Sequence, residues 1–246
     1  MRRISQEKFI RKYNFQKSDY YQNNEWLYIL NFTKNTQFKI KSLPSKIEFT
    51  DKCGDIIFND LSEIPSNVIF NNNGLVSLPS VKKIFENVVF NNNGDLYLYN
   101  LKGINPNTKI TNKGDVEFCY TIRSIKKGLT FNNKGNINII HIEKIEENVV
   151  FNNEGDLNLG LLKKAHPSVK FNNKGDILLF NNELYPPKLV FNNKGNIIFP
   201  YVNRIPENTV FNNDGDVLLN IQKTITISKG VKFYNKGNVN CSYKTI

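Results

Sequence analysis

A carboxylate or an amide follows a glycine at regular intervals along this 246-residue chain. The carboxylates are Asp55, Asp95, Asp115, Asp156, Asp176 and Asp216, and amides stand in the same place at Asn136, Asn196 and Asn238. Carboxylates stacked one strand apart are able to bind Ca²⁺ or to act as a paired acid and base in hydrolysis. Asp and Asn also accept hydrogen bonds from turn backbones, and a group present once per turn is usually structural. We therefore expect a structural column, with calcium binding and hydrolysis as the alternatives.

Two histidines, His141 and His166, are the other groups with obvious chemistry. Neither has a Cys or Asp at the spacing of metal ligands, so we expect ordinary surface histidines. The chain also contains no Walker loop, no GxSxG and no HExxH motif. The sequence predicts a protein that is not an enzyme and that holds no cofactor and no metal.

The glycines of the column are almost evenly spaced. They are Gly54, Gly74, Gly94, Gly114, Gly135, Gly155, Gly175, Gly195, Gly215 and Gly237, at intervals of 20 to 22 residues. We expect each glycine to take a positive φ angle at a tight corner, because glycine does so without strain. From Asn72 onward an asparagine stands two residues before each glycine. Amides stacked at one corner predict a hydrogen-bonded asparagine ladder.

Short apolar segments with a period of two lie on both sides of each corner. Around Gly155, Val149 and Phe151 precede the corner and Leu157 and Leu159 follow it, with one residue inside each pair. Alternation over so few residues is typical of strands. Two strands and two turns per repeat predict a solenoid, in which stacked coils bury their apolar sides against each other.

The repeat also resembles a known family. The phrase "IPxNVxF" (with Ile64-Pro65 and Ile205-Pro206) and the phrase "GDLxLxxLxxI" from Gly94 to Ile104 are similar to short bacterial or phage-type leucine-rich repeats over residues 43–246. In this chain the Asn precedes the strand rather than following it. We expect a mainly all-β fold: a right-handed, leucine-rich-repeat-like β-solenoid of about ten 20-residue coils. The resemblance implies a binding scaffold without catalysis.

The two ends of the array are expected to need caps, because a terminal coil exposes its apolar side. Residues 1–46 lack the repeat and are predicted to form a basic α+β cap in front of the array at 47–246. Ser5 is expected to cap a helix over "QEKFIRKY", and "NEWLYILNF" is expected to form a strand with Trp26 in the cap core. At the other end, an open edge makes a homodimer through the C-terminal edge possible.

Charge and cysteine content bear on partners and compartment. The net charge is +11, and residues 1–46 hold ten basic and three acidic residues, a net of +7. Cys53, Cys119 and Cys241 lie far apart, which argues against a disulfide framework. No apolar run resembles a signal peptide or reaches the length of a membrane span. These observations predict a cytoplasmic protein that does not enter a membrane.

The outward positions of the second strand, three and five residues after each glycine, are unexpectedly apolar. A surface that met only water would be polar there. The large residues at these positions are Tyr97, Tyr99, Ile140, Leu178, Phe180, Ile198 and Leu218. Exposed apolar patches of this kind mark interaction sites. The sequence therefore predicts another protein or protein complex as the partner.

A basic surface is the alternative. Its candidates are Arg2, Arg3, Lys8, Arg11 and Lys12 in the cap, and Lys113, Lys134, Lys174 and Lys194 one residue before the corner glycines. Such a set would bind RNA or a ribonucleoprotein through phosphates. Glu154 and Asp214 interrupt the lysine column, and no aromatic residue alternates with the lysines to stack on bases. We place nucleic-acid binding second.

These inferences give one leading hypothesis. A repeat scaffold without catalytic groups acts as an adaptor or a stoichiometric inhibitor, here by docking through its aromatic and aliphatic strand face. A phage-encoded inhibitor of a host defence complex, such as an anti-CRISPR protein acting on a CRISPR effector, fits this profile by analogy.

Overall fold

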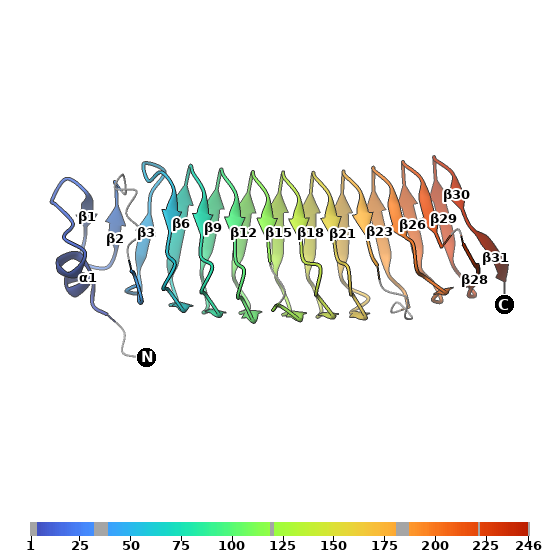
Figure 1. Cartoon of the computed structure of the whole chain (residues 1–246), viewed down its shortest axis with the longest axis horizontal. Helices are drawn as coiled ribbons and strands as arrows, with labels where there is room; N and C mark the ends of the chain where they lie inside the picture. Colours follow the sequence, from blue (N-terminus) through green and yellow to red (C-terminus); the bar gives the residue numbers. More distant parts are fainter. Residues whose placement is uncertain (1–3, 32–38, 119–120, 181–186, 221, 246) are drawn as a thin grey trace. The chain divides into compact units, whose positions relative to one another are not determined.

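The computed structural model describes residues 4–31, 39–118, 121–180, 187–220 and 222–245. With 40% strand and 3% helix, it confirms the prediction of a mainly all-β chain built as a β-solenoid with a 20-residue spacing. The chain divides into two compact units, Met1–Thr121 and Ile122–Ile246. In each unit the strands stack coil upon coil, as Figure 1 shows. Where the structure describes a whole coil of the repeat, the coil carries three strands, one in each of three sheets. The prediction of two strands per repeat is therefore wrong, because the third strand is mostly two residues long and leaves no alternating pattern in the sequence.

The first unit begins with the helix α1 (Gln6–Lys12). Its first sheet contains, in spatial order, β1 (Tyr20–Gln22), β2 (Leu27–Ile29), β3 (Ile47–Phe49), β6 (Val68–Asn72), β9 (Val89–Asn92) and β12 (Lys109–Asn112). Its second sheet contains β4 (Ile56–Ile57), β7 (Val76–Ser77), β10 (Leu96–Tyr97) and β13 (Val116–Glu117), and its third β5 (Glu63–Ile64), β8 (Lys83–Ile84) and β11 (Gly103–Ile104). Of these strands, β1 is paired antiparallel.

The second unit repeats the arrangement. Its first sheet contains β15 (Thr130–Asn133), β18 (Val150–Asn153), β21 (Lys170–Asn173), β23 (Val190–Asn193), β26 (Val210–Asn213) and β29 (Lys232–Asn235). Its second contains β16 (Ile137–Asn138), β19 (Leu157–Asn158), β22 (Ile177–Leu178), β24 (Ile197–Phe199), β27 (Val217–Leu219) and β30 (Val239–Asn240). Two short third sheets contain β14 (Ser124–Ile125), β17 (Lys144–Ile145) and β20 (Lys164–Ala165), and β25 (Arg204–Ile205), β28 (Thr224–Ile227) and β31 (Ser242–Thr245).

The core is a set of columns in which each side chain lies over its own counterpart. The register shows why, because Phe151 pairs with Phe171 when β18 meets β21. In the second unit the stacked rings are 4.9–5.6 Å apart and 3–17° from parallel; they belong to Phe131, Phe151, Phe171, Phe191, Phe211 and Phe233. Strand pairing fixes the separation of the coils at about 4.8 Å, so the rings have to stack.

The predicted asparagine ladder is confirmed. Asn133 Nδ2 donates to Asn153 Oδ1 at 3.0 Å, and Asn153 Nδ2 donates to Asn173 Oδ1 at 2.9 Å. Asn153 Nδ2 also donates to the carbonyl oxygen of Gly155 at 2.6 Å. Since the three asparagines are only 2–3% exposed, these bonds satisfy polar groups that water does not reach.

The expectation that the repeat glycines take positive φ angles is wrong. Among the glycines that the structure describes, positive φ occurs at Gly128 and Gly230, which are outside the repeat column. The repeat glycines are required by contact instead. A Cβ on Gly175 would lie 2.5 Å from the carbonyl carbon and oxygen of Gly155 in the preceding coil. At the corner, the backbones of successive repeat glycines therefore lie directly against each other.

Apart from Asn14 in the cap, the positive φ angles lie in the return turn, which we define as the segment that leads into each first-sheet strand of the repeat. They range from 56° to 76° three residues before the Phe position, at Lys46, Asn67, Asn87, Asn107, Gly128, Asn148, Lys188, Asn208 and Gly230. Asn and Gly predominate there because they enter the left-handed region at the lowest cost. The Asn and Gly residues of the return turn therefore form a second periodic pattern in the sequence, offset from the pattern of the corner glycines.

The cap has the predicted helix. Ser5 Oγ accepts a hydrogen bond from the Lys8 backbone N–H at 3.2 Å, and the helix buries Phe9 completely. The prediction that Trp26 lies in the cap core is wrong, because Trp26 is half-buried. Its neighbours Leu27 and Ile29 alternate inward and are fully buried in β2.

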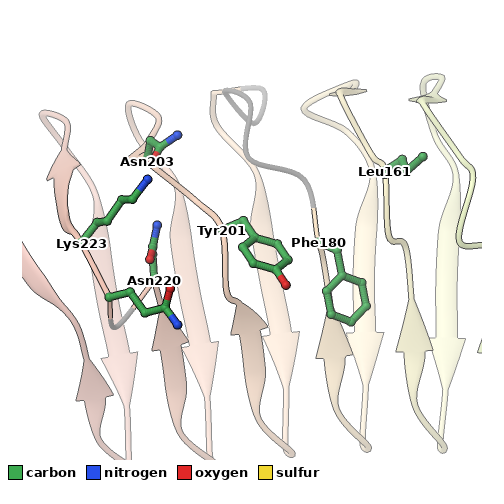
Figure 2. Close-up of a pocket in the computed structure, with 7 residues that line it drawn as sticks. Leu161, Phe180, Tyr201, Asn203, Asn220 and Lys223 are labelled. Carbon is green, nitrogen blue, oxygen red and sulfur yellow. The ribbon is translucent and has the colours of Figure 1, made fainter.

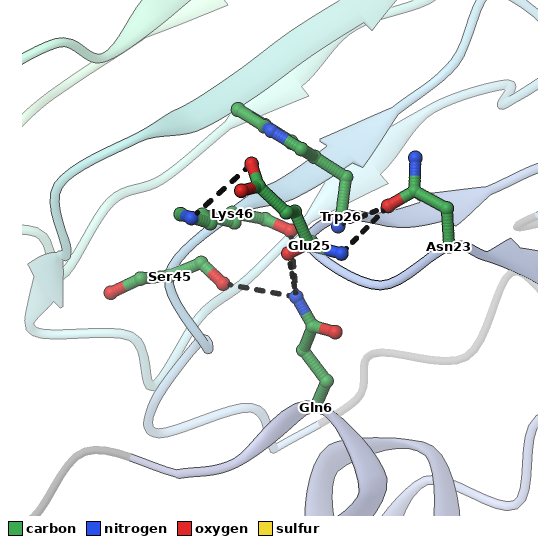
Figure 3. Close-up of polar contacts among 6 residues, drawn as sticks. All are labelled: Gln6, Asn23, Glu25, Trp26, Ser45 and Lys46. Carbon is green, nitrogen blue, oxygen red and sulfur yellow. Dashed lines mark hydrogen bonds and ion pairs between the residues drawn. The ribbon is translucent and has the colours of Figure 1, made fainter.

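A polar contact holds the cap helix against the first coils. Gln6 Nε2 donates to the carbonyl oxygens of Glu25 at 3.0 Å and Lys46 at 2.9 Å, as Figure 3 shows. Strand β2 already pairs in parallel with β3, Leu27 opposite Ile47. The 20-residue register therefore begins within residues 1–46.

We predict that Gly175→Ala destabilises the protein by about 1–3 kcal/mol, because the new Cβ overlaps the Gly155 backbone. Gly54→Ala is the matched control. Gly54 has the same repeat position, but a Cβ added there would meet no atom within 4 Å. Chemical denaturation of both variants measures the difference, and equal losses would contradict the contact argument.

The two asparagines of one strand provide a second prediction. Asn153→Ala should cost about 2–3 kcal/mol, because it removes the amide that donates to the buried Asn173 Oδ1 and to the Gly155 carbonyl oxygen. Asn152→Ala should cost less than about 1 kcal/mol. Asn152 also bonds to its counterpart Asn132, at 2.8 Å, but it is exposed, so water can replace the lost bond. Similar unfolding midpoints for the two variants would argue against a structural role for the inner ladder.

Candidate protein-binding surface

The outer side of the second sheet is built by strand alternation. Ile177 and Leu179 are fully buried, whereas Leu178 between them is half-buried. Successive side chains of a strand point to opposite sides. The position three residues after each corner glycine therefore lies on the outside, as the sequence predicted.

In the second unit these positions form a continuous aliphatic row. Leu178 pairs with Ile198, and Ile198 pairs with Leu218, across β22, β24 and β27. All three side chains are half-buried, since neighbours in the row cover part of each other. Beside the row, Ile140 and Phe180 are 38% and 37% exposed. Five of the predicted residues thus share one side of the second unit.

A glycine separates the two most exposed members of this surface. Gly160 occupies the coil between those of Ile140 and Phe180, and its carbonyl oxygen accepts the Phe180 backbone N–H at 2.8 Å. A Cβ at Gly160 would lie 2.7 Å from the Ile140 carbonyl oxygen. The outer side of the sheet therefore has no side chain at Gly160, between Ile140 and Phe180.

A hollow of about 350 Å³ lies next to Phe180; it is lined by Leu161, Phe180, Tyr201, Asn203, Asn220, Gln222 and Lys223. Figure 2 shows Leu161, Phe180 and Tyr201 toward one end, with Asn203, Asn220 and Lys223 toward the other. Tyr201 is 55% exposed and was missed from the sequence. It stands six residues after Gly195, one place beyond the positions that alternation assigned to the outer side.

The polar end of the hollow offers hydrogen-bond donors and a positive charge. Asn220 is 6% exposed, and its Nδ2 donates to the Val202 carbonyl oxygen at 3.0 Å. Gln222 and Lys223 are exposed. Among the described residues that line the hollow, Lys223 is the one ionisable group besides the phenol of Tyr201. The hollow therefore suits a partner with an apolar group beside a carboxylate or another acceptor.

In the first unit, the two predicted tyrosines form a separate stacked pair. The rings of Tyr97 and Tyr99 have centroids 5.4 Å apart and are inclined by 16°. Tyr97 donates its hydroxyl to Asp95 Oδ2 at 3.0 Å, and Tyr99 donates to Glu117 Oε2 at 3.3 Å. The hydrogen bond to Asp95, followed by burial, raises the pKa of Tyr97 to about 12. Both rings are half-buried and held by these bonds.

The basic candidates are exposed, but several have acidic neighbours. On α1, Lys8, Arg11 and Lys12 face solvent, with Arg11 3.9 Å from Glu7. Arg2 and Arg3 lie outside the described residues. Of the lysines before the corner glycines, Lys113, Lys134, Lys174 and Lys194 are all exposed. Lys174 forms an ion pair with Glu154 at 3.2 Å, which reduces the positive charge of the second-unit column.

The face formed by β14, β17 and their flanking residues also carries ion pairs between successive coils. Arg123 pairs with Glu143 at 3.2 Å, and Lys126 pairs with Glu146 at 3.0 Å, one coil apart. The hydrogen bond from Lys126 is the main reason that the pKa of Glu146 is lowered. Glu143 also pairs with Lys163 at 3.9 Å and Glu146 with Lys144 at 3.3 Å, so each of these acids serves two cations. The pairs link successive coils and leave part of the positive charge of this face unbalanced.

The carboxylates after the corner glycines are used as backbone acceptors. Asp95 Oδ1 accepts the Asp115 N–H at 2.8 Å. Asn136 Oδ1 accepts the Asp156 N–H at the same distance, so the amide performs the same role. This supports the structural interpretation of the column. In the described part of the chain, no three His, Cys, Asp or Glu side chains gather closely enough to hold a metal ion.

The remaining reactive groups are held in structural contacts. His166 Nδ1 lies 2.8 Å from Ser168 Oγ in a turn. Burial raises the pKa of the Cys53 thiol to about 12 and also raises the pKa of Cys241, so neither is a ready thiolate at neutral pH. Cys119 lies outside the described residues.

No family model, no curated protein and no solved structure matches this chain. Across the segments that the structure describes, no helix has the length and apolar character needed to cross a membrane.

The hydroxyl of Tyr97 allows a test of the first-unit pair. We predict that Tyr97 ionises at about pH 12, since ionisation would break the hydrogen bond that its hydroxyl donates to Asp95. The stabilisation from this bond is fully present below the ordinary tyrosine pKa, and it is lost as the pH rises toward the folded value. Ultraviolet titration of the phenolate measures the ionisation.

Asp95→Asn is the matched variant, because Asn already fills this position in the coil of Asn136. It should keep the corner bond and bring the Tyr97 pKa toward its ordinary range. An unchanged titration curve in this variant would contradict the assignment.

Proposed function

We propose that this chain is a non-enzymatic protein-binding scaffold whose contact surface is the outer side of the second sheet in the second unit. One observation carries the proposal: aliphatic and aromatic side chains that the fold does not need for its core are gathered there beside a hollow. The core of the same coils is complete without them, because Ile177, Leu179 and their counterparts are fully buried.

The chemistry of this surface favours a protein partner over a small ligand. Protein interfaces are enriched in aromatic residues at their centre and carry a polar rim. Phe180 and Tyr201 provide exposed rings, the row of Leu178, Ile198 and Leu218 provides apolar area, and Asn203 and Lys223 provide a polar border. Small-molecule sites are usually enclosed and concave, whereas this row of three side chains lies on the open outer side of the sheet.

A binding scaffold of this kind would act as an adaptor or as a stoichiometric inhibitor. The phage-encoded inhibitor of a CRISPR effector remains one case of the second role, in keeping with the resemblance to phage-type repeats. Cytoplasmic location remains part of the same hypothesis, supported by the spacing of Cys53, Cys119 and Cys241.

Nucleic-acid binding is supported less well. It would rest on α1 and on the corner lysines, but Glu154 and Asp214 interrupt that column in the second unit, and Lys174 and Lys236 are paired with them. Bases stack on aromatic side chains, and no aromatic residue alternates with these lysines in the sequence. A site-specific crosslink separates the two possibilities.

The proposal predicts a position-specific crosslink. A benzophenone amino acid placed at Phe180 should capture one dominant partner protein when the purified chain is irradiated in a lysate of its source organism. Tyr201→Ser in the same chain should reduce that adduct at least tenfold, because it removes a ring from the same hollow.

The matched control carries the photoreactive residue at Tyr21, which is an exposed aromatic residue of the cap, 58% accessible. It should not give the same adduct. Capture of the same proteins from both positions would contradict the proposed surface. Loss of the adduct after nuclease treatment would favour the nucleic-acid alternative.

A further inference from the structure

An aromatic cluster lies on the hairpin that β1 and β2 form in the cap. Tyr21 pairs with Tyr28 across the two strands, and their ring centroids are 5.8 Å apart. The ring of Trp26 lies 6.5 Å from that of Tyr28. Tyr21 is 58% exposed, and the other two rings are half-buried. The core does not need these rings, because Leu27 and Ile29 fill the buried side of β2.

A hollow of about 580 Å³ lies at the turn of the same hairpin; it is lined by Tyr21, Gln22, Asn23, Asn24, Glu25 and Trp26. Rings therefore stand at the first and last of these positions, with amides and a carboxylate between them. Asn24 is exposed, and its amide bonds to no described residue. The indole N–H of Trp26 likewise has no acceptor among the described residues. These polar groups are available to a ligand.

The turn that carries these groups is held by its own hydrogen bonds. Asn23 Oδ1 accepts the backbone N–H groups of Glu25 at 2.9 Å and of Trp26 at 2.6 Å (Figure 3). Gln6 of α1 supports the turn from outside, because its Oε1 accepts Gln22 Nε2 at 2.8 Å and its Nε2 donates to the Glu25 carbonyl oxygen at 3.0 Å. The hollow is therefore formed without a ligand, which lowers the entropic cost of binding.

The hollow carries little net charge. Among the described residues that line it, Glu25 is the one acid or base besides the phenol of Tyr21. The Glu25 Oε2 lies 3.4 Å from Lys46 Nζ, so the carboxylate has a counter-ion. An anionic ligand would meet the charge of Glu25, and a basic ligand would have to displace Lys46. An uncharged ligand fits this balance best.

The hollow offers both donors and acceptors of hydrogen bonds. The Asn24 amide donates and accepts, the indole of Trp26 donates, and the carboxylate of Glu25 accepts. A hydroxyl group matches such a mixture, because it donates one hydrogen bond and accepts others. Proline-rich segments also dock on aromatic grooves, but proline has no backbone N–H to donate. Such a segment would leave the acceptors of the hollow unmet.

We propose that this hollow binds a sugar ring of a neutral carbohydrate. The C–H groups on one face of a pyranose ring pack against the negative face of an aromatic ring, here Tyr21 or Trp26. The hydroxyls at the edge of the sugar then reach Asn24 and Glu25. Phe180 is not part of this site. The proposal is therefore independent of the protein-binding surface, and either one can fail without the other.

The test uses the fluorescence of Trp26, which is the only tryptophan of the chain and so reports this site alone. Titration with cellohexaose, chitohexaose and maltohexaose should shift the emission saturably for at least one of these sugars. The affinity should not change with added salt, because the ligand carries no charge. A decaproline peptide should produce no shift. No shift with any of the sugars, or a shift with decaproline alone, would overturn the proposal.

Two variants that keep Trp26 locate the binding. Tyr21→Ser removes a ring from the hollow and Asn24→Ala removes an amide, and each should weaken sugar binding about tenfold. Tyr243→Ser is the matched control, because Tyr243 is also 58% exposed but lies on β31 in the second unit. It should bind like the unaltered chain, and circular dichroism should show that every variant is folded. Equal weakening by all of these variants would contradict a site at the hairpin.

Discussion

The structure depends on how closely successive coils approach each other at the glycine corner. The backbone of one repeat glycine lies against the backbone of the preceding one, with no space for a Cβ. This contact fixes the register of the three sheets, because a shift of one residue would replace glycine by a larger side chain. The buried asparagines then meet their own counterparts and satisfy each other.

Because the coil-to-coil contact fixes so many positions, variation is confined to the outward ones. Phe, Asn and Gly recur at their places in nearly every coil, whereas the outward positions of the second sheet range from Asn158 to Leu178 and Phe180. The hollow beside Phe180 arises from such differences, since Tyr201, Asn203 and Lys223 fill places that carry other residues in neighbouring coils. A regular framework thus carries an irregular surface.

The stacking of successive coils also determines how charged residues pair. Where acids and bases fall one coil apart, they pair, as Arg123 does with Glu143, and contribute little to any external field. The acids after the corner glycines are bound to backbone N–H groups of the next coil. The balance is incomplete, because Glu143 and Glu146 each pair with two cations.

The sequence by itself determined the repeat, two of the three strands of each coil, the inner ladder and the outward positions, because a spacing of about twenty residues allows one register for every coil. It missed the third strand, which has two residues in most coils and is too short to show an alternating pattern. It misjudged the glycines, since the letter Gly does not distinguish a positive φ from a close backbone contact. Only the tertiary structure placed the left-handed residues in the return turn, left Trp26 half-buried, and brought Tyr201 beside Phe180. Those outcomes depend on contacts between residues that are far apart along the chain but adjacent in space.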